Sequence, residues 1–398
     1  MSKTVVFLGD GMADEPIQEL NGKTPLEAAN TPAMDRIAKC GQSGTLLTLP
    51  DGFPTSSDVA NLSVLGGDLA TELCGRGPLE AASQGIPMGE DDVVFRMNLV
   101  SVSPDGILTD FSGGHIGEKE QIEAISLLNS QIADNWKGND GEYIKFYAGV
   151  SYRNLILLHG KAFSGAAVAY DKPDDNSGNQ VKEHLPRAKT PDGEYTAKVL
   201  NEVIEKASQV LSGRTANGVW PWSGGKAGAI HSIPERYGVK GAIVAAVDVI
   251  NGLGRVMGLD VIKVPGATGY IDTNYEGKAD AALKALADGY DFVYVHIEST
   301  DEVSHAQDLK LKLQAIEDFD RRIIKRVMDN APQGTAFAVL PDHPVPLAIG
   351  RHTRTPVPVA ICKPGMTPDL VQSYNEKEAP NGALGAMKGS DFMDILLK

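Results

Sequence analysis

Short apolar runs rich in β-branched residues alternate with longer amphipathic segments along this chain. That alternation is typical of an α/β protein built around a central sheet. The strand candidates are Thr4–Leu8, Val93–Val102, Asn154–Leu158, Gly241–Val247, Asp291–Ile297 and Thr335–Leu340. Two helices are expected where apolar residues recur at helical spacing and form a packing face. They are Glu120–Ile132, with Ile122, Ile125, Leu128 and Ile132 on one face, and about Leu309–Val327.

The length of the chain bears on its domain organisation. At 398 residues it is too long for one ordinary core, so two domains or one domain with an insertion are expected. The longest apolar runs are far short of a membrane span. The N-terminal segment lacks the long apolar stretch and small-residue cleavage site of a signal peptide. We therefore expect a cytoplasmic protein.

Charge and cysteine content exclude several classes of function. The formal net charge of −15 argues against nucleic acid or an anionic membrane as partner. An anionic substrate would instead need positive charge concentrated locally, through metals or a few arginines. The three cysteines, Cys40, Cys74 and Cys362, lie far apart without a CxxC spacing, so neither a disulfide nor a thiolate metal site is expected. A monomer or small homo-oligomer is compatible with all of this.

The segment from Ser112 to Lys189 differs from its flanks in composition, because Gly-rich and polar stretches bound it. It begins with Ser112-Gly113-Gly114 and ends after the polar stretch 171–178. Flexible connections of this kind often bound an inserted domain. We therefore expect a catalytic core formed by residues 1–112 and 190–398, with residues 113–189 inserted as a smaller α/β lid domain.

Acidic and histidine side chains follow three of the predicted strands. Because ligands bind at the carboxyl ends of strands in open α/β sheets, these side chains should meet at one edge. Oxygen from Asp and nitrogen from His are ligands suited to Mn²⁺, Zn²⁺ or iron, whereas Mg²⁺ prefers oxygen. Each residue taken alone has another explanation, such as a helix cap or a surface position. The set is Asp10 after the first strand, Asp301 and His305 four residues apart after Ile297, Asp342 and His343 after Leu340, and His352 nine residues on.

A serine pair opens a short predicted helix. Val59, Leu62 and Leu65 form the apolar side of that helix, and two glycines end it. Ser56 or Ser57 therefore lies at a helix N-terminus. It could be an N-cap, or a nucleophile whose negative charge the free N–H groups would stabilise.

Several blocks of the chain together resemble the archaeal-type cofactor-independent phosphoglycerate mutases, members of the alkaline phosphatase superfamily. The likeness extends in order from about residue 4 to residue 395. It implies an alkaline-phosphatase-like three-layer core with a central, mainly parallel sheet. The blocks are Gly9-Asp10-Gly11, 57–63 (SDVANLS), 75–81 (GRGPLEA), 265–269 (PGATG), 296–305, Asp342-His343 and 352–358.

The resemblance implies a role for each candidate. One divalent ion would be bound by Asp10, Ser57, Asp342 and His343. A second ion would be bound by Asp301, His305 and His352. Mn²⁺ is the expected ion, with Mg²⁺, Zn²⁺ or Co²⁺ possible. Ser57 would carry the phosphate as it moves between the 3- and 2-hydroxyls of glycerate, while the lid excludes water.

The same resemblance places Arg76, Arg153, Arg255 and His115 at the substrate, a small phosphorylated metabolite. The lid departs from many archaeal relatives at Gly113-Gly114-His115-Ile116 and at 170–174. Lid residues select the substrate, so a homoserine kinase-like phosphotransferase is an alternative. The chain has no Gly-x-x-x-x-Gly-Lys-Ser/Thr loop for a nucleotide. A metal-dependent phosphatase or phosphodiesterase, or a silent metal-binding protein, are further alternatives.

Overall fold

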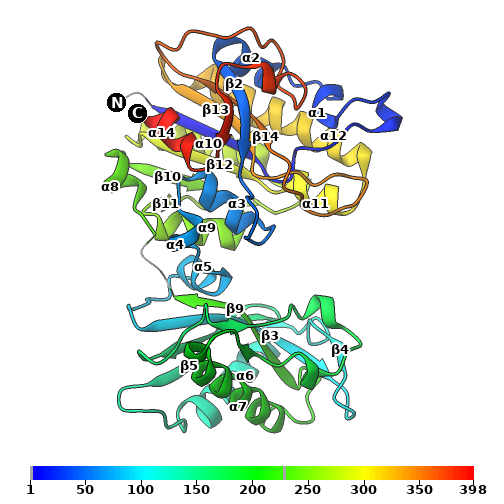
Figure 1. Ribbon diagram of the computed structural model, residues 1–398, viewed down its shortest axis with the longest axis vertical. Coiled ribbons are helices and arrows are strands. Elements are labelled where there is room, and N and C mark those ends of the chain that lie inside the picture. The colour runs from blue at the N-terminus through cyan, green and yellow to red at the C-terminus, as the bar shows by residue number, and fades with distance from the viewer. Residues whose placement is uncertain (1–2, 227–229) are drawn as a thin grey trace. The chain divides into compact units, whose positions relative to one another are not determined.

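The computed structural model describes residues 3–226 and 230–398, and the chain divides into two compact units (Figure 1). The first unit comprises Met1–Leu73 and Ile230–Lys398, and the second comprises Cys74–Ala229. The inserted unit is therefore wider than the predicted range of 113–189. The reason is that β3 (Asp92–Val102) and β9 (Gly218–Lys226) both lie outside that range yet pair with each other.

The described residues of the first unit form an eight-stranded sheet in the order β11-β10-β12-β1-β13-β14-β2-β15. Its strands run parallel except for β14, which pairs antiparallel with β13 and β2. The predicted α/β fold with a mainly parallel sheet is thus confirmed. The strands are β1 (Thr4–Gly9), β2 (Gln42–Leu47), β10 (Gly241–Val244), β11 (Asp260–Val261), β12 (Phe292–Ile297), β13 (Ala336–Pro341), β14 (Val357–Cys362) and β15 (Gly385–Lys388).

Helices cover both faces of this sheet (Figure 1). One face packs on α2 (Pro32–Cys40), α10 (Tyr275–Ala287) and the helical segments between Leu309 and Asn330. Alternate strand residues such as Val5, Phe7 and Val295 supply the sheet side of that core and are fully buried. The other face carries α3 (Ser57–Val64), α9 (Asp248–Val256) and α14 (Asp391–Leu397).

The second unit has its own sheet and core. Among its described residues, β3 pairs with β6 (Arg153–His159) on one side and with β9 on the other, all antiparallel. β5 (Tyr143–Val150) extends the sheet beyond β6, and β4 (Leu108–Asp110) pairs with the end of β3. Helices α6 (Glu118–Leu128) and α7 (Glu194–Val210) bury their apolar sides against one face.

The two predicted helices are present, but each contains a π-helical segment. α6 continues as a π-turn at Asn129–Ala133. The long C-terminal helix is α12 (Leu309–Asp318), a π-segment at Phe319–Ile324 and α13 (Lys325–Asn330). One residue of the predicted packing face was placed wrongly: Ile122 is 53% exposed, while Gln121 beside it is buried. The buried side of this helix carries Gln121, Ile125, Leu128 and Ile132 at regular helical spacing, so Ile122 lies one position off the packing face.

The expectation of no disulfide was wrong. Cys40 at the end of α2 and Cys362 at the end of β14 form one, with Cα atoms 5.6 Å apart across 322 residues of sequence. The fold brings together a helix end and a strand end that their spacing in sequence could not relate. Cys74 is buried, as expected of a small apolar side chain. Within the described ranges, no helix is long and apolar enough to cross a membrane.

Candidate metal centre

Three parallel strands of the first unit end level with one another. The register sets Gly9 of β1 beside Ile297 of β12 and Pro341 of β13. The residues that follow these strands therefore emerge at one edge of the sheet. This edge holds Asp10, the helix α11 (Ser299–His305) and the pair Asp342-His343.

A first cluster forms around His343, which is fully buried. Its Nε2 atom lies 3.3 Å from Asp10 Oδ1, 3.4 Å from Asp342 Oδ2 and 3.2 Å from Ser57 Oγ. The structure thus brings together the four residues predicted to bind one ion. Backbone N–H groups of Gly11 and His343 donate to Asp342 Oδ1, which fixes that carboxylate.

A second cluster forms around Asp301 on α11. His305, one turn along, places its Nε2 atom 3.3 Å from Asp301 Oδ2. His352 places its Nε2 atom 3.4 Å from Asp301 Oδ1, and the two Nε2 atoms are 2.9 Å apart. The rings of His343 and His352 stack with centroids 3.8 Å apart, so the two clusters adjoin. These are the three residues predicted to bind the second ion.

The donor atoms fit divalent cations. Asp10, Asp342 and His343 can each direct one ligand atom to a common point, and so can Asp301, His343 and His352. Within the described residues, Asp10 Oδ1 and Asp301 Oδ1 are buried without a hydrogen-bond partner. Buried carboxylate oxygens are rarely left so unless a cation completes them. The mixture of oxygen and imidazole ligands suits Mn²⁺ or Zn²⁺.

The electrostatics of the first cluster also favour a bound cation. Burial, reinforced by the neighbouring Asp342, raises the pKa of Asp10 well above its ordinary value. Burial lowers the pKa of His343 to about 3, with His352 adding to the effect. A neutral imidazole beside crowded carboxylates is the protonation state that metal binding requires. Positive charge from cations would relieve the repulsion among the carboxylates.

Ser57 is the first residue of α3, and Ser56 is its N-cap, in extended conformation and without a side-chain capping bond. The prediction of a serine at this helix N-terminus is confirmed. The capping alternative does not apply to Ser57, because its Oγ atom faces His343. Its position at the N-terminus also directs the first backbone N–H groups of α3 toward any negative charge on that oxygen.

Sequence reasoning assigned no role to several residues that orient the ligands. His296, fully buried on β12, has its Nε2 atom 3.1 Å from Asp10 Oδ2 and 3.9 Å from Glu298 Oε2. Asn61 donates to Asp342 Oδ2 at 2.8 Å and to Ser57 O at 2.9 Å. A polar residue inside a buried strand, and an Asn one turn after the serine, were the signals available in the sequence.

The predicted substrate residues lie in both units. Arg76 is in the first turn of α5 (Arg76–Ser83), Arg153 begins β6, and His115 lies in the loop after β4; all three are in the second unit. Arg255 lies on α9 of the first unit. His115 adopts a positive φ of 53° and donates its backbone N–H to Ser112 Oγ at 3.1 Å.

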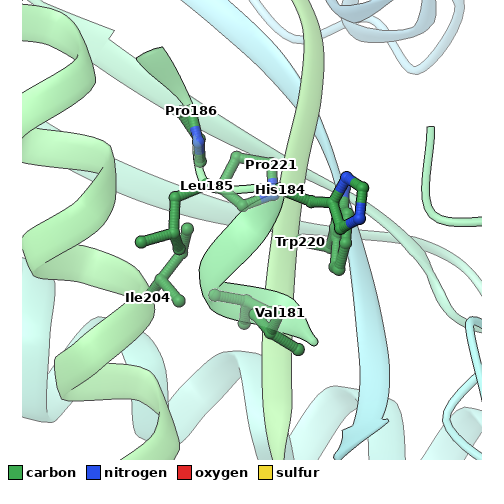
Figure 2. A pocket seen from close by; sticks show the side chains of 8 residues that line it. Val181, His184, Leu185, Pro186, Ile204, Trp220 and Pro221 are labelled. Carbon is green, nitrogen blue, oxygen red and sulfur yellow. The ribbon is translucent and has the colours of Figure 1, made fainter. Parts of the chain in front are cut away.

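Two pockets lie away from these residues. An apolar pocket in the second unit has a volume of about 10 Å³. Trp220, His184 and Ile204 are among its lining residues (Figure 2). That volume holds one water molecule at most. A surface pocket of about 310 Å³ in the first unit is lined by Glu276 and three arginines. Two of them, Arg322 and Arg326, already form bidentate pairs with Glu276 and Asp280.

Comparisons with known proteins identify relatives of the chain. The model of the Metalloenzyme superfamily matches residues 2–398. The 2,3-bisphosphoglycerate-independent phosphoglycerate mutase of Methanosarcina acetivorans is 43% identical over 408 residues, covering 100% of both chains. The chain belongs to this family. A probable mutase of the same kind from Geobacter sulfurreducens is 42% identical over 99% of each chain.

Two solved structures have a similar fold. A protein of Pyrococcus horikoshii aligns with a TM-score of 0.80 and 29% identity, covering 99% of this chain and 96% of its own. The cofactor-independent phosphoglycerate mutase of Thermoplasma acidophilum aligns with a TM-score of 0.69 and 26% identity, covering 100% and 99%. The family membership inferred from the motifs is therefore confirmed along the full length of the chain.

Proposed function

We propose that this protein interconverts 3-phosphoglycerate and 2-phosphoglycerate through a phosphoserine at Ser57, with two divalent cations bound by the two clusters. The observation that carries the proposal is the position of Ser57 Oγ, 3.2 Å from His343 Nε2 within the first cluster. A hydroxyl oriented by a structural cap would not lie among buried acidic and histidine ligands. Full-length relatives named as this mutase supply the substrate.

The chemistry is a double transfer without net change of atoms. Ser57 Oγ forms a bond to phosphorus as the bond to one glycerate oxygen breaks, and that oxygen gains the proton the serine loses. The other glycerate hydroxyl then takes the phosphoryl group back and returns a proton to Ser57. Bound cations would lower the pKa of the serine hydroxyl and neutralise charge on the phosphoryl group.

The residues of the chain do the positioning. Asp342 is held by Gly11 N–H, His343 N–H and Asn61, so its oxygens cannot turn away. The N-terminal N–H groups of α3 stabilise the negative charge that the phosphate brings to Ser57. Because water would hydrolyse the phosphoserine, the glycerate must be retained between the two transfers, and we assign that role to the second unit as a lid.

Substrate recognition falls to cationic groups. We assign Arg76, Arg153 and His115 of the second unit, and Arg255 of the first, to the carboxylate and phosphate of phosphoglycerate. Arg is suited to this because its planar fork donates two hydrogen bonds to an oxyanion. Mn²⁺ in both clusters, a cytoplasmic location and a monomer or small homo-oligomer complete the proposal.

The test is an assay of purified protein with Mn²⁺ and 3-phosphoglycerate, without nucleotide or bisphosphoglycerate. Formation of 2-phosphoglycerate is expected, and a phosphate should be found on Ser57 by mass spectrometry after a rapid quench. Ser57→Ala should abolish both signals, while Ser56→Ala, its neighbour outside the cluster, should keep them. A metal-replete protein that forms no 2-phosphoglycerate would disprove the proposal.

A parallel assay tests homoserine as the alternative phosphate acceptor. The loop at 113–116 belongs to the second unit, to which we assign substrate recognition. Homoserine with ATP, added in place of phosphoglycerate, should give no phosphohomoserine if the mutase proposal holds. Formation of phosphohomoserine would instead make homoserine the acceptor, with Ser57 as the same phosphate carrier.

A further inference from the structure

The chain segment that leads into Ser57 has few contacts of its own. It comprises residues 49–56, which connect β2 to α3. Gly52 in this segment has a positive φ of 89° and open space where a side chain would lie. Because Ser57 follows directly, movement of this segment would displace its hydroxyl. The exposed members of the segment are Asp51, Gly52, Pro54 and Thr55.

One arginine fastens this segment. Arg354 Nη1 donates to Leu49 O at 3.3 Å and to Pro50 O at 2.7 Å. Its Nη2 atom donates to Phe53 O at 2.5 Å, and its Nε atom lies 3.7 Å from Asp51 Oδ1. Among the described residues, no other hydrogen bond reaches the backbone of the segment outside the first turn of α3. The guanidinium of this one residue therefore fixes the path of the chain before the helix.

The fold explains why Arg354 reaches the segment. β2 and β14 pair antiparallel, with Leu46 beside Val357, so the chain leaving β2 passes the chain that enters β14. Arg354 lies just before β14. A guanidinium presents five N–H donors in a fixed planar fork, so one side chain can hold several carbonyl groups at once.

The loop that carries Arg354 is held by other contacts. Thr353 donates its backbone N–H to Pro344 O at 3.1 Å. His352 lies 3.4 Å from Asp301 within the second cluster. Loss of the Arg354 guanidinium should therefore release the segment before α3 and leave the second cluster in place.

We propose that Arg354 is a positioning residue for phosphoryl transfer, which holds the segment before α3 and thereby keeps Ser57 Oγ within the first cluster. The reaction that it serves rests on the proposed function. Arg354 does not act on the substrate, because its fork is occupied by backbone carbonyls. A displacement of about 1 Å at a reacting group can lower a rate on the order of 10²-fold, so a residue outside the reacting set can matter this much.

The experiment compares Arg354→Met with the parent as full-length, Mn²⁺-loaded protein. With 3-phosphoglycerate, we expect kcat to fall roughly 10- to 100-fold because Ser57 is misplaced. The rate of phosphoserine formation, followed by rapid quench and mass spectrometry, should fall by the same factor. KM should stay near that of the parent, since the residues assigned to substrate recognition are elsewhere in the chain. Mn²⁺ affinity, measured by equilibrium dialysis, should also be kept.

Two further variants calibrate this result. Arg354→Lys keeps the charge but loses the fork, so its kcat should lie between those of the parent and Arg354→Met. Arg326→Met is the matched control, because Arg326 lies in the same unit and forms a bidentate pair with Asp280 at the surface. Its kcat should equal that of the parent. Cleavage after Asp51 by a protease specific for acidic residues should be faster in Arg354→Met than in Arg326→Met, because the segment is released.

Orthovanadate probes Ser57 without the mutase reaction, because vanadium bonded to the serine oxygen takes the place of the transferred phosphorus. Its binding to the Mn²⁺-loaded protein is measured by calorimetry, with Ser57→Ala as the reference for loss of that bond. Arg354→Met should weaken vanadate binding roughly tenfold, since an analogue of the transition state depends on the position of the nucleophile.

Equal kcat, phosphoserine formation and vanadate affinity in Arg354→Met and Arg326→Met would overturn the proposal. A lower melting temperature with these three quantities unchanged would likewise assign Arg354 to folding alone. A parent protein that forms no 2-phosphoglycerate would reject the proposed function, whereas weaker vanadate binding in Arg354→Met would still support the positioning role. If Arg354→Met does not fold, Arg354→Lys decides the same questions, because it keeps the charge at this position.

Discussion

At the scale of single residues, Asn61 connects three residues of the site, although the sequence assigned it no role. It holds Asp342 and the backbone of Ser57, and its Oδ1 accepts from Tyr294 at 2.7 Å. Asn61→Ala should lower Mn²⁺ affinity and kcat roughly 10- to 100-fold, as removal of a ligand-orienting bond does. Equilibrium dialysis and steady-state kinetics measure the two effects.

Tyr294→Phe is the graded comparison, because it removes only the bond that orients Asn61. It should shift both quantities in the same direction by less. Unchanged Mn²⁺ affinity in Asn61→Ala, with a normal melting temperature, would mean that Asp342 is held in place without it.

Glu376 makes stability depend on pH. Burial raises its pKa to about 7, although it accepts bonds from Asp14 N–H and Thr24 Oγ1. The folded state therefore retains a proton that the unfolded chain releases near pH 4.5. This contribution to stability is present below pH 4.5 and is lost as pH rises to about 7.

Glu376→Gln should remove that loss, which amounts to about 3 kcal/mol across the interval. Urea unfolding at several pH values between 4.5 and 8 measures it, and the variant should show the flatter profile. Identical slopes for variant and parent would show that Glu376 titrates as an exposed carboxyl.

The sequence predicted those site residues that directly follow a strand and missed those that lie inside one. Asp10, Asp301 and Asp342 follow buried strands and could be grouped by that rule alone. His296 was overlooked because it lies inside β12, where a fully buried side chain is normally apolar.

At the scale of elements, α12 supports the metal centre through one buried charge. Lys312 Nζ, fully buried, lies 2.8 Å from Asp14 Oδ2, 3.0 Å from Val345 O and 3.4 Å from Ala13 O. Ala13 and Asp14 belong to the loop that carries Asp10, and Val345 follows His343. The ammonium group thus fastens together two loops that supply ligands.

Lys312→Met should destabilise the protein by roughly 3–5 kcal/mol, because it leaves Asp14 buried without its counter-charge. Mn²⁺ affinity should fall as well, since the loops can separate. The double variant with Asp14→Asn should recover much of the stability but not the affinity. Recovery of both in the double variant would show that Lys312 serves folding alone.

Strands could be predicted from the sequence where both of their faces are buried, because such strands are short continuous apolar runs. The strands β1, β12 and β13 were found because central parallel strands are continuously apolar. The π-segments were not, since one extra residue per turn leaves no distinct signal. The Cys40–Cys362 disulfide and the pairing of β3 with β9 were also beyond reach, because both join segments far apart in sequence.

At the scale of the whole molecule, each unit has a separate apolar core. The core on α2, α10 and their strands draws only on the first unit, and the core under α6 and α7 only on the second. The chain leaves and re-enters the first unit at neighbouring points, because Glu72 Oε2 lies 3.0 Å from His231 Nδ1. A short linker could therefore replace residues 74–229.

That replacement tests whether the first unit binds the metals and the second unit retains the substrate. The shortened protein should still bind Mn²⁺, because every residue of the two clusters belongs to the first unit. Without the second unit, nothing would retain glycerate, and water would take the phosphoryl group from Ser57. Release of phosphate from 3-phosphoglycerate or p-nitrophenyl phosphate should replace mutase activity, and Ser57→Ala in the shortened chain should abolish it. Retention of 2-phosphoglycerate formation would instead assign substrate retention to the first unit.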